Sequence, residues 1–208
     1  MNVTILGGGA WGTAIAIHVV KYLSSATKSK VRLWVRDVEH ARQMNASGYN
    51  DPYLPGISLP KDLEITSDWQ FALSGISSEN DLIIIATPLA ALREVALNLC
   101  KYKPLESLAI QNWLWLCKGI EAESDLLPHE IVEKVILQSN KTGSIHYGVL
   151  SGPSFAKEVA LGLPCALTLA SKFQELIEIA QPLFHQKSMR IYATDDVTGV
   201  ELGGAIKN

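Results

Sequence analysis

The chain has 208 residues, of which 48% are hydrophobic and 19% are charged. This composition is that of a globular protein and excludes a disordered chain. The net charge of −3 argues against a general nucleic-acid binder, because such a protein presents a basic surface. No apolar run reaches the length of a membrane span, and the apolar start lacks the basic segment of a signal peptide.

The three cysteines, Cys100, Cys117 and Cys165, are scattered through the chain. They form no Cys-x-x-Cys pair and no His/Cys cluster, so neither a disulfide framework nor a metal site is predicted. We therefore expect a reducing, cytoplasmic setting.

The first stretch of the chain changes from a strand-like to a helix-like pattern across spaced glycines. Val3–Leu6 is a short apolar run typical of a buried parallel strand, and a helix is expected from Thr13 to about Leu23. Between them, Gly7, Gly9 and Gly12 fit G-x-G-x-x-G. These glycines would permit a tight turn, backbone approach to a pyrophosphate, and close packing of helix on strand. The stretch predicts a dinucleotide site, with a purely structural glycine turn as the alternative.

The remaining chain alternates between apolar runs and helical patterns. Further strands are expected at Val31–Val35, Leu63–Thr66, Asp81–Ala86, within Ala109–Cys117, at Tyr147–Leu150 and near Ala166–Leu169. Helices are expected at Val38–Ser47, Trp69–Leu73, Leu89–Cys100, Leu127–Leu137, Lys172–Phe184 and from about Asp196 onward. Tyr49–Pro60, with three prolines, is expected to be a loop. The alternation predicts an α/β fold of the Rossmann type, with a doubly wound, mostly parallel sheet and helices on both faces.

The second strand ends at Arg36 and Asp37, where a dinucleotide fold meets the adenosine ribose. Asp37 could accept a hydrogen bond from the ribose 2′-hydroxyl of NAD, and Arg36 could pair with the 2′-phosphate of NADP. We favour NADP(H), with NAD(H) possible. In the alternative interpretation, Arg36 is only a solvated charge and Asp37 caps the next helix.

Two lysines are candidate ligand contacts. Lys118 follows a strand and therefore lies at the carboxyl edge of the sheet, where ligands bind in open α/β folds, with an ordinary surface lysine as the alternative. Lys207 shares a helix face with Gly203 and Gly204, whose missing side chains would allow close approach of another backbone or a ligand. A lysine desolvated in such a crevice has a lowered pKa and can exchange protons near neutral pH. His18, in a nearly all-apolar helix, is expected to be a core or interface residue.

Five motifs in this order resemble those of bacterial NAD(P)-dependent sn-glycerol-3-phosphate dehydrogenases. They are residues 7–14 (GGGAWGTA), 33–37 (LWVRD), 117–121 (CKGIE), 151–158 (SGPSFAKE) and 203–208 (GGAIKN). The resemblance implies reversible hydride transfer between NAD(P)H and dihydroxyacetone phosphate, which yields sn-glycerol 3-phosphate for glycerophospholipid synthesis.

The resemblance also assigns roles to single residues of this chain. Implied cofactor contacts are Ala10, Trp11, Arg36, Tyr53, Lys118 and Ala156, beside the three glycines of the turn. Implied substrate contacts are Lys118, Gly152 and Ser154. Lys207 matches the catalytic lysine, whose ammonium would polarise the ketone and protonate the developing alkoxide. Cys117 stands where the family has a threonine.

Family members continue into an all-helical domain that supplies an acidic partner for the lysine and an Arg-Asn pair for the substrate phosphate. We therefore expect residues 1–194 to be the cofactor domain and residues 195–208 to begin the helix that leads to the helical domain. Turnover by this chain alone should be poor, and the exposed face of the last helix could support a homodimer. A related β-hydroxyacid or 6-phosphogluconate type reductase, and a non-enzymatic nucleotide-sensing module, are the alternatives.

Overall fold

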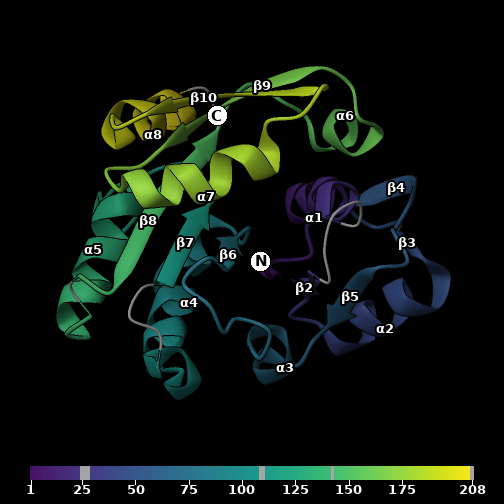
Figure 1. Cartoon of the computed structure of the whole chain (residues 1–208), viewed down its shortest axis with the longest axis horizontal. Coiled ribbons are helices and arrows are strands. Elements are labelled where there is room, and N and C mark those ends of the chain that lie inside the picture. Colours follow the sequence, from purple (N-terminus) through teal and green to yellow (C-terminus); the bar gives the residue numbers. More distant parts are fainter. Residues whose placement is uncertain (24–28, 108–110, 142, 207–208) are drawn as a thin grey trace.

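A computed structural model describes residues 1–23, 29–107, 111–141 and 143–206. Its main sheet has eight strands in the order β10-β9-β8-β7-β6-β1-β2-β5 (Figure 1). The strands are β1 (Val3–Leu6), β2 (Val31–Trp34), β5 (Leu63–Thr66), β6 (Leu82–Ile85), β7 (Gln111–Trp115), β8 (Ile145–Ser151), β9 (Cys165–Ala170) and β10 (Met189–Thr194). Among these strands β8 and β9 are antiparallel, whereas the other neighbours are parallel. The prediction of a mostly parallel, Rossmann-type sheet is confirmed.

Helices cover both faces of this sheet. One face carries α1 (Ala10–Leu23), α2 (Val38–Ser47), α6 (Ala156–Leu161) and α7 (Gln174–Phe184). The other carries α3 (Trp69–Leu73), α4 (Leu89–Lys101), α5 (Pro128–Gln138) and α8 (Val197–Ile206), with a 3₁₀ helix, η1 (Lys103–Ser107), after α4. Figure 1 shows α1 beside α6 and α4 beside α5.

The central strands are buried on both sides. Ile5 and Leu6 are adjacent in β1 and each is fully buried, yet Ile5 belongs to the hydrophobic core under α1 and Leu6 to the core under α4. Successive side chains of a strand point to opposite faces, so a strand between two helical layers is buried on both sides. This explains why β6 is an unbroken apolar run, and why the polar residue of β1, Thr4, has its hydroxyl hydrogen-bonded to the carbonyl oxygen of Ala72.

Four of the described strands and α-helices were not predicted. Tyr49–Pro60, expected to be a loop, contains an antiparallel hairpin of β3 (Tyr49–Asn50) and β4 (Leu54–Ser58). Prolines are tolerated there because each strand of a two-stranded hairpin has a free edge. Helix α6 and strand β10 were also missed; β10 forms the edge of the sheet, where Met189 and Ile191 are buried and the residues after each are exposed. None of the described helices is long and apolar enough to cross a membrane.

Candidate functional site

The glycine-rich turn between β1 and α1 is shaped by contacts that only glycine permits. Gly7 has a φ of +129°, and a Cβ at that position would lie 2.7 Å from the carbonyl oxygen of Ala86. A Cβ on Gly12 would lie 2.0 Å from the carbonyl oxygen of Gly7. A Cβ on Gly9, in contrast, would meet nothing within 4 Å. Gly7 and Gly12 are thus required by packing, whereas Gly9 borders open space.

This geometry fits the pyrophosphate of a dinucleotide. The first backbone N–H groups of α1 have no partner within the helix, and the helix dipole places partial positive charge at that end. Ala10 and Trp11, which begin α1, are half-buried. Ala156, at the start of α6, packs against the same hydrophobic core as Trp11. The predicted cofactor residues of α1 and α6 therefore lie on neighbouring helices.

The two charged residues after β2 have different surroundings: Arg36 is exposed to solvent, whereas the side chain of Asp37 caps the next helix. The Asp37 side chain accepts a hydrogen bond from the backbone N–H of His40 at 2.6 Å and caps α2. The alternative role of Asp37 as a helix cap is thus what the structure shows. Arg36 is exposed, and no carboxylate among the described residues forms an ion pair with it. Tyr53 is 55% exposed, and its ring centroid lies 5.4 Å from that of His40.

The predicted substrate residues meet at the other end of the same edge. Lys118 follows β7, and its Nζ donates a hydrogen bond to the carbonyl oxygen of Gly152, after β8, at 3.0 Å. A Cβ on Gly152 would lie 2.8 Å from Cδ2 of Leu167, so only glycine fits there. A Cβ on Gly204 of α8 would lie 3.1 Å from Oγ of Ser151 and 3.5 Å from Cδ of Lys118. Lys207 lies outside the described residues.

Two buried hydroxyl groups on this edge have no hydrogen-bond partner within the described structure. They are Oγ of Ser154 and Oγ1 of Thr87. Buried polar atoms are nearly always hydrogen-bonded, so each of these two hydroxyls is a candidate for a ligand contact. Ser154 was predicted as a substrate residue, whereas Thr87 was missed. Thr87 directly follows Ala86, which contacts Gly7, and its position after a buried strand was the available signal.

The helix α8 is held by a buried carboxylate that the sequence did not reveal as a site residue. Glu201 is 3% exposed, and its side chain accepts hydrogen bonds from Nε1 of Trp115 at 2.8 Å and from Nδ1 of His129 at 2.6 Å. It also accepts from the backbone N–H of His129 in the first turn of α5 at 3.1 Å. Burial raises the pKa of Glu201, against the opposing effect of His129. These bonds fix the helix that carries Gly204.

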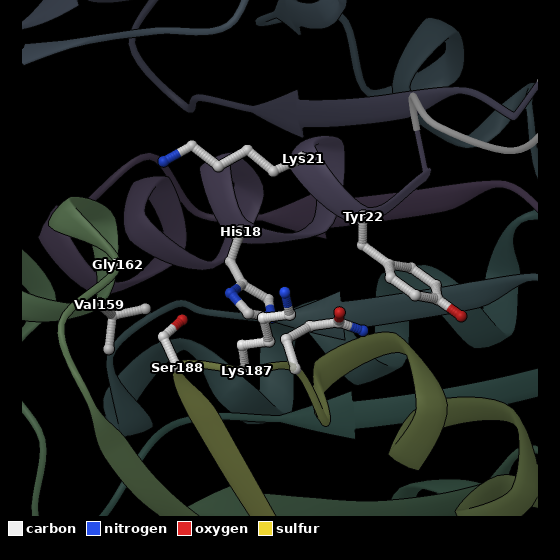
Figure 2. Close-up of a pocket in the computed structure, with 8 residues that line it drawn as sticks. His18, Lys21, Tyr22, Val159, Gly162, Lys187 and Ser188 are labelled. Carbon is white, nitrogen blue, oxygen red and sulfur yellow. The ribbon is translucent and has the colours of Figure 1, made fainter.

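A separate pocket of about 280 Å³ lies between α1, α6 and the chain that enters β10. Figure 2 shows His18 and Lys187 extending toward each other within it. His18 is buried, lies within hydrogen-bonding distance of the carbonyl oxygen of Phe184 at 3.2 Å, and has its pKa lowered by burial. It is thus the core residue that was expected. The predicted cofactor and substrate residues do not line this pocket.

Together, the doubly wound sheet and the sterically fixed glycine turn define a dinucleotide-binding domain of the dehydrogenase type. The family model described as NAD-dependent glycerol-3-phosphate dehydrogenase N-terminus matches residues 2–177. The chain is 47% identical, over its whole length, to a glycerol-3-phosphate dehydrogenase (NAD(P)+) of Polynucleobacter asymbioticus, and it spans 59% of that protein. It therefore belongs to the NAD(P)-dependent glycerol-3-phosphate dehydrogenase family, as predicted.

Solved structures agree with this assignment. Glycerol-3-phosphate dehydrogenase from Coxiella burnetii is 33% identical with a TM-score of 0.80, and the match covers 98% of this chain and 56% of that one. GDP-mannose dehydrogenase from Pseudomonas aeruginosa has a TM-score of 0.74 at 12% identity, over 100% of this chain and 48% of that one, which shows the shared fold alone. Family membership argues against the alternative β-hydroxyacid or 6-phosphogluconate type reductase.

Proposed function

We propose that the protein interconverts dihydroxyacetone phosphate and sn-glycerol 3-phosphate with NAD(P)H and NAD(P)+, and that residues 1–194 form its cofactor-binding part. The observation that carries this proposal is the joint geometry of one sheet edge. A glycine turn open at Gly9 lies at one end, and Lys118 lies against Gly152 and Gly204 at the other. Bound at this edge, the nicotinamide cofactor would supply or accept the hydride.

Each part of the edge has a distinct task in this proposal. Gly9, Ala10 and Trp11 would bind the pyrophosphate through backbone N–H groups. The ammonium of Lys118 and the hydroxyl of Ser154 would contact cofactor and substrate, where a fixed cation favours a phosphate or a polarised carbonyl. Lys207, which follows the described part of α8 in the sequence, would hold and return the proton at the substrate oxygen.

The cofactor preference is proposed to be NADP(H), with NAD(H) as the weaker ligand. Support comes from Arg36, which is exposed and not ion-paired with the described carboxylates, and from Asp37, which is already engaged as a helix cap. A guanidinium can bind a 2′-phosphate through charge-assisted hydrogen bonds, whereas a ribose hydroxyl offers no charge to pair.

A titration of the protein with NADPH and with NADH tests the cofactor assignment. Arg36→Ala should weaken NADPH binding about tenfold, corresponding to about 1.4 kcal/mol, and leave NADH binding unchanged. Arg42→Ala is the matched control, because Arg42 is an exposed arginine on the adjacent helix that pairs with Glu39. Equal binding of both cofactors, with no effect of Arg36→Ala on either, would contradict the assignment of this corner.

The remaining features of the proposal concern the whole protein. The chain spans 59% and 56% of the two family relatives compared above, and residues 195–208 are proposed to lead toward a further helical domain. We expect the 208 residues alone to bind cofactor but to reduce dihydroxyacetone phosphate poorly, as followed by the absorbance of reduced nicotinamide. Cofactor binding with no turnover, even in a full-length relative into which this segment is grafted, would favour the nucleotide-sensing alternative.

The cytoplasmic setting, the role in glycerophospholipid synthesis and the homodimer stay predictions. Light scattering of the purified protein tests the homodimer.

A further inference from the structure

A buried amide links the hairpin β3–β4 to the glycine-rich turn. Asn50 is fully buried, and its Nδ2 donates hydrogen bonds to the carbonyl oxygen of Gly8 at 3.0 Å and to Oγ1 of Thr13 at 2.7 Å. Thr13, in the first turn of α1, is also fully buried. One side chain therefore contacts both the turn and the helix that follows it.

The carbonyl oxygen of Gly8 determines which way the amide of Asn50 faces, and this in turn fixes the role of a third partner, His40. A carbonyl oxygen can only accept a hydrogen bond, so the amino group must face Gly8 and Oδ1 must face the other way. Oδ1 lies 2.8 Å from Nε2 of His40, and because Oδ1 can only accept, Nε2 must carry the proton. His40 belongs to α2, whose cap is Asp37, next to Arg36.

Gly8, the middle residue of the turn, is held from two sides. A Cβ on Gly8 would lie 2.6 Å from Cγ2 of Val35, so the residue after β2 presses on one side of Gly8. Asn50 holds its carbonyl oxygen on the other. The peptide that precedes Gly9 cannot rotate freely between these contacts, and a preorganised turn loses less conformational entropy when a ligand binds.

We propose that Asn50 is a positioning residue for the cofactor, and that with His40 it couples the pyrophosphate turn to the ribose corner. The coupling between the turn and the ribose corner rests on the proposed function, because it requires a dinucleotide to bind there. The contacts by which Asn50 holds the turn do not depend on that function. Asn50 itself is fully buried and acts through Gly8, Thr13 and His40 rather than by touching the ligand. None of the five family motifs contains Asn50, and the segment that carries it was expected to be a loop.

The test compares Asn50→Ala with Asn45→Ala. Asn45 lies on α2 and also donates two hydrogen bonds to backbone carbonyls, those of Ala41 and Ile65, but it does not contact the turn. His40→Ala is the third variant, because it keeps both donors of Asn50 and removes the partner of its Oδ1. It also removes the ring contact with Tyr53, so amide exchange is its deciding readout. All three are measured in the 208-residue protein by amide hydrogen exchange without ligand, by NADPH titration and by thermal unfolding.

We expect Asn50→Ala to accelerate exchange across residues 7–13 and to weaken NADPH binding about tenfold, the effect of one or two lost hydrogen bonds. His40→Ala should change both in the same direction by less, and Asn45→Ala should change neither. Unchanged exchange across residues 7–13 in Asn50→Ala would overturn the proposal, whether or not NADPH binds. Exchange that rises uniformly along the chain would overturn it as well, since that is loss of global stability. If Asn50→Ala does not fold, the exchange pattern of His40→Ala decides in the same way. Absence of NADPH binding by the unaltered protein would instead refute the proposed function and leave the exchange result standing.

Discussion

Replacing single glycines of the turn should separate its packing role from its binding role. In Gly12→Ala the new methyl group would lie 2.0 Å from the carbonyl oxygen of Gly7 and 2.9 Å from Cβ of Ala86. Neither neighbour can retreat easily, because Gly7 is tied to β2 by a hydrogen bond from its N–H to the carbonyl oxygen of Trp34 at 3.0 Å. Helix α1 would have to move away from the sheet.

The expected cost of Gly12→Ala is about 3 kcal/mol or more in the free energy of unfolding, at the upper end for overpacked cores. Gly9→Ala makes the matched comparison, since its methyl group would point into open space and its φ is not in the left-handed region. That variant should stay within about 1 kcal/mol of the unaltered protein, the range for alanine in place of glycine at a helix start. Its methyl group would, however, occupy the space that a pyrophosphate needs, so NADPH binding should weaken about tenfold or more.

Urea unfolding gives the first quantity and NADPH titration the second. The two variants should differ in kind: Gly12→Ala loses stability, and Gly9→Ala loses affinity for NADPH at nearly unchanged stability. If Gly9→Ala is as unstable as Gly12→Ala, the space beside Gly9 is not open. If Gly9→Ala binds NADPH like the unaltered protein, the pyrophosphate does not lie against this turn.

Three further outcomes follow from two buried ionisable groups, Glu201 and Cys117. Glu201→Ala should cost about 3 kcal/mol in urea unfolding, because it leaves the N–H donors of Trp115 and His129 unpaired. Burial raises the pKa of Glu201 above its ordinary value of 4.5, so the folded chain retains this proton to higher pH than the unfolded chain. The stability that Glu201 contributes should therefore be fully present below about pH 4.5 and should decline as pH rises through the folded-state pKa. Glu201→Gln should flatten this dependence of the free energy of unfolding on pH. A steeper decline in Glu201→Gln would contradict the predicted direction. Burial also raises the pKa of Cys117 to about 12. Iodoacetamide at neutral pH should therefore alkylate the half-buried Cys165 before Cys117 in the folded protein, as measured by mass spectrometry. Equal rates of alkylation would show that Cys117 is accessible.

The parts of the site that could be predicted from sequence are those fixed by local spacing. Gly7, Gly9 and Gly12 lie within six residues, and their roles follow from the backbone geometry of one strand, turn and helix. Lys118 and Gly152 could be placed at one edge because each follows a strand of a parallel sheet. The contact between them, which was not itself predicted, required only that β7 and β8 be neighbours, which they are.

The parts that could not be predicted depend on contacts across long stretches of sequence. Asn50 lies 42 residues from Gly8 and 37 from Thr13. Glu201 lies 86 residues from Trp115 and 72 from His129. Neither pattern has a characteristic spacing, because the separation is set by how many elements the chain forms before it returns. Asn50 also stood among turn-forming residues, where asparagine is ordinary and suggests no buried role.

The helix α8 depends on polar contacts more than on apolar burial. Its buried residues are Val197 and Glu201, whereas Leu202 is 39% exposed and Ile206 is 83% exposed. A helix with so little apolar surface against the sheet gains little from the hydrophobic effect. Buried polar pairs seldom add stability over an apolar replacement, but they accept only one arrangement of their donors. Glu201 therefore sets where α8 lies, and through Gly204 it determines how closely this helix approaches Lys118.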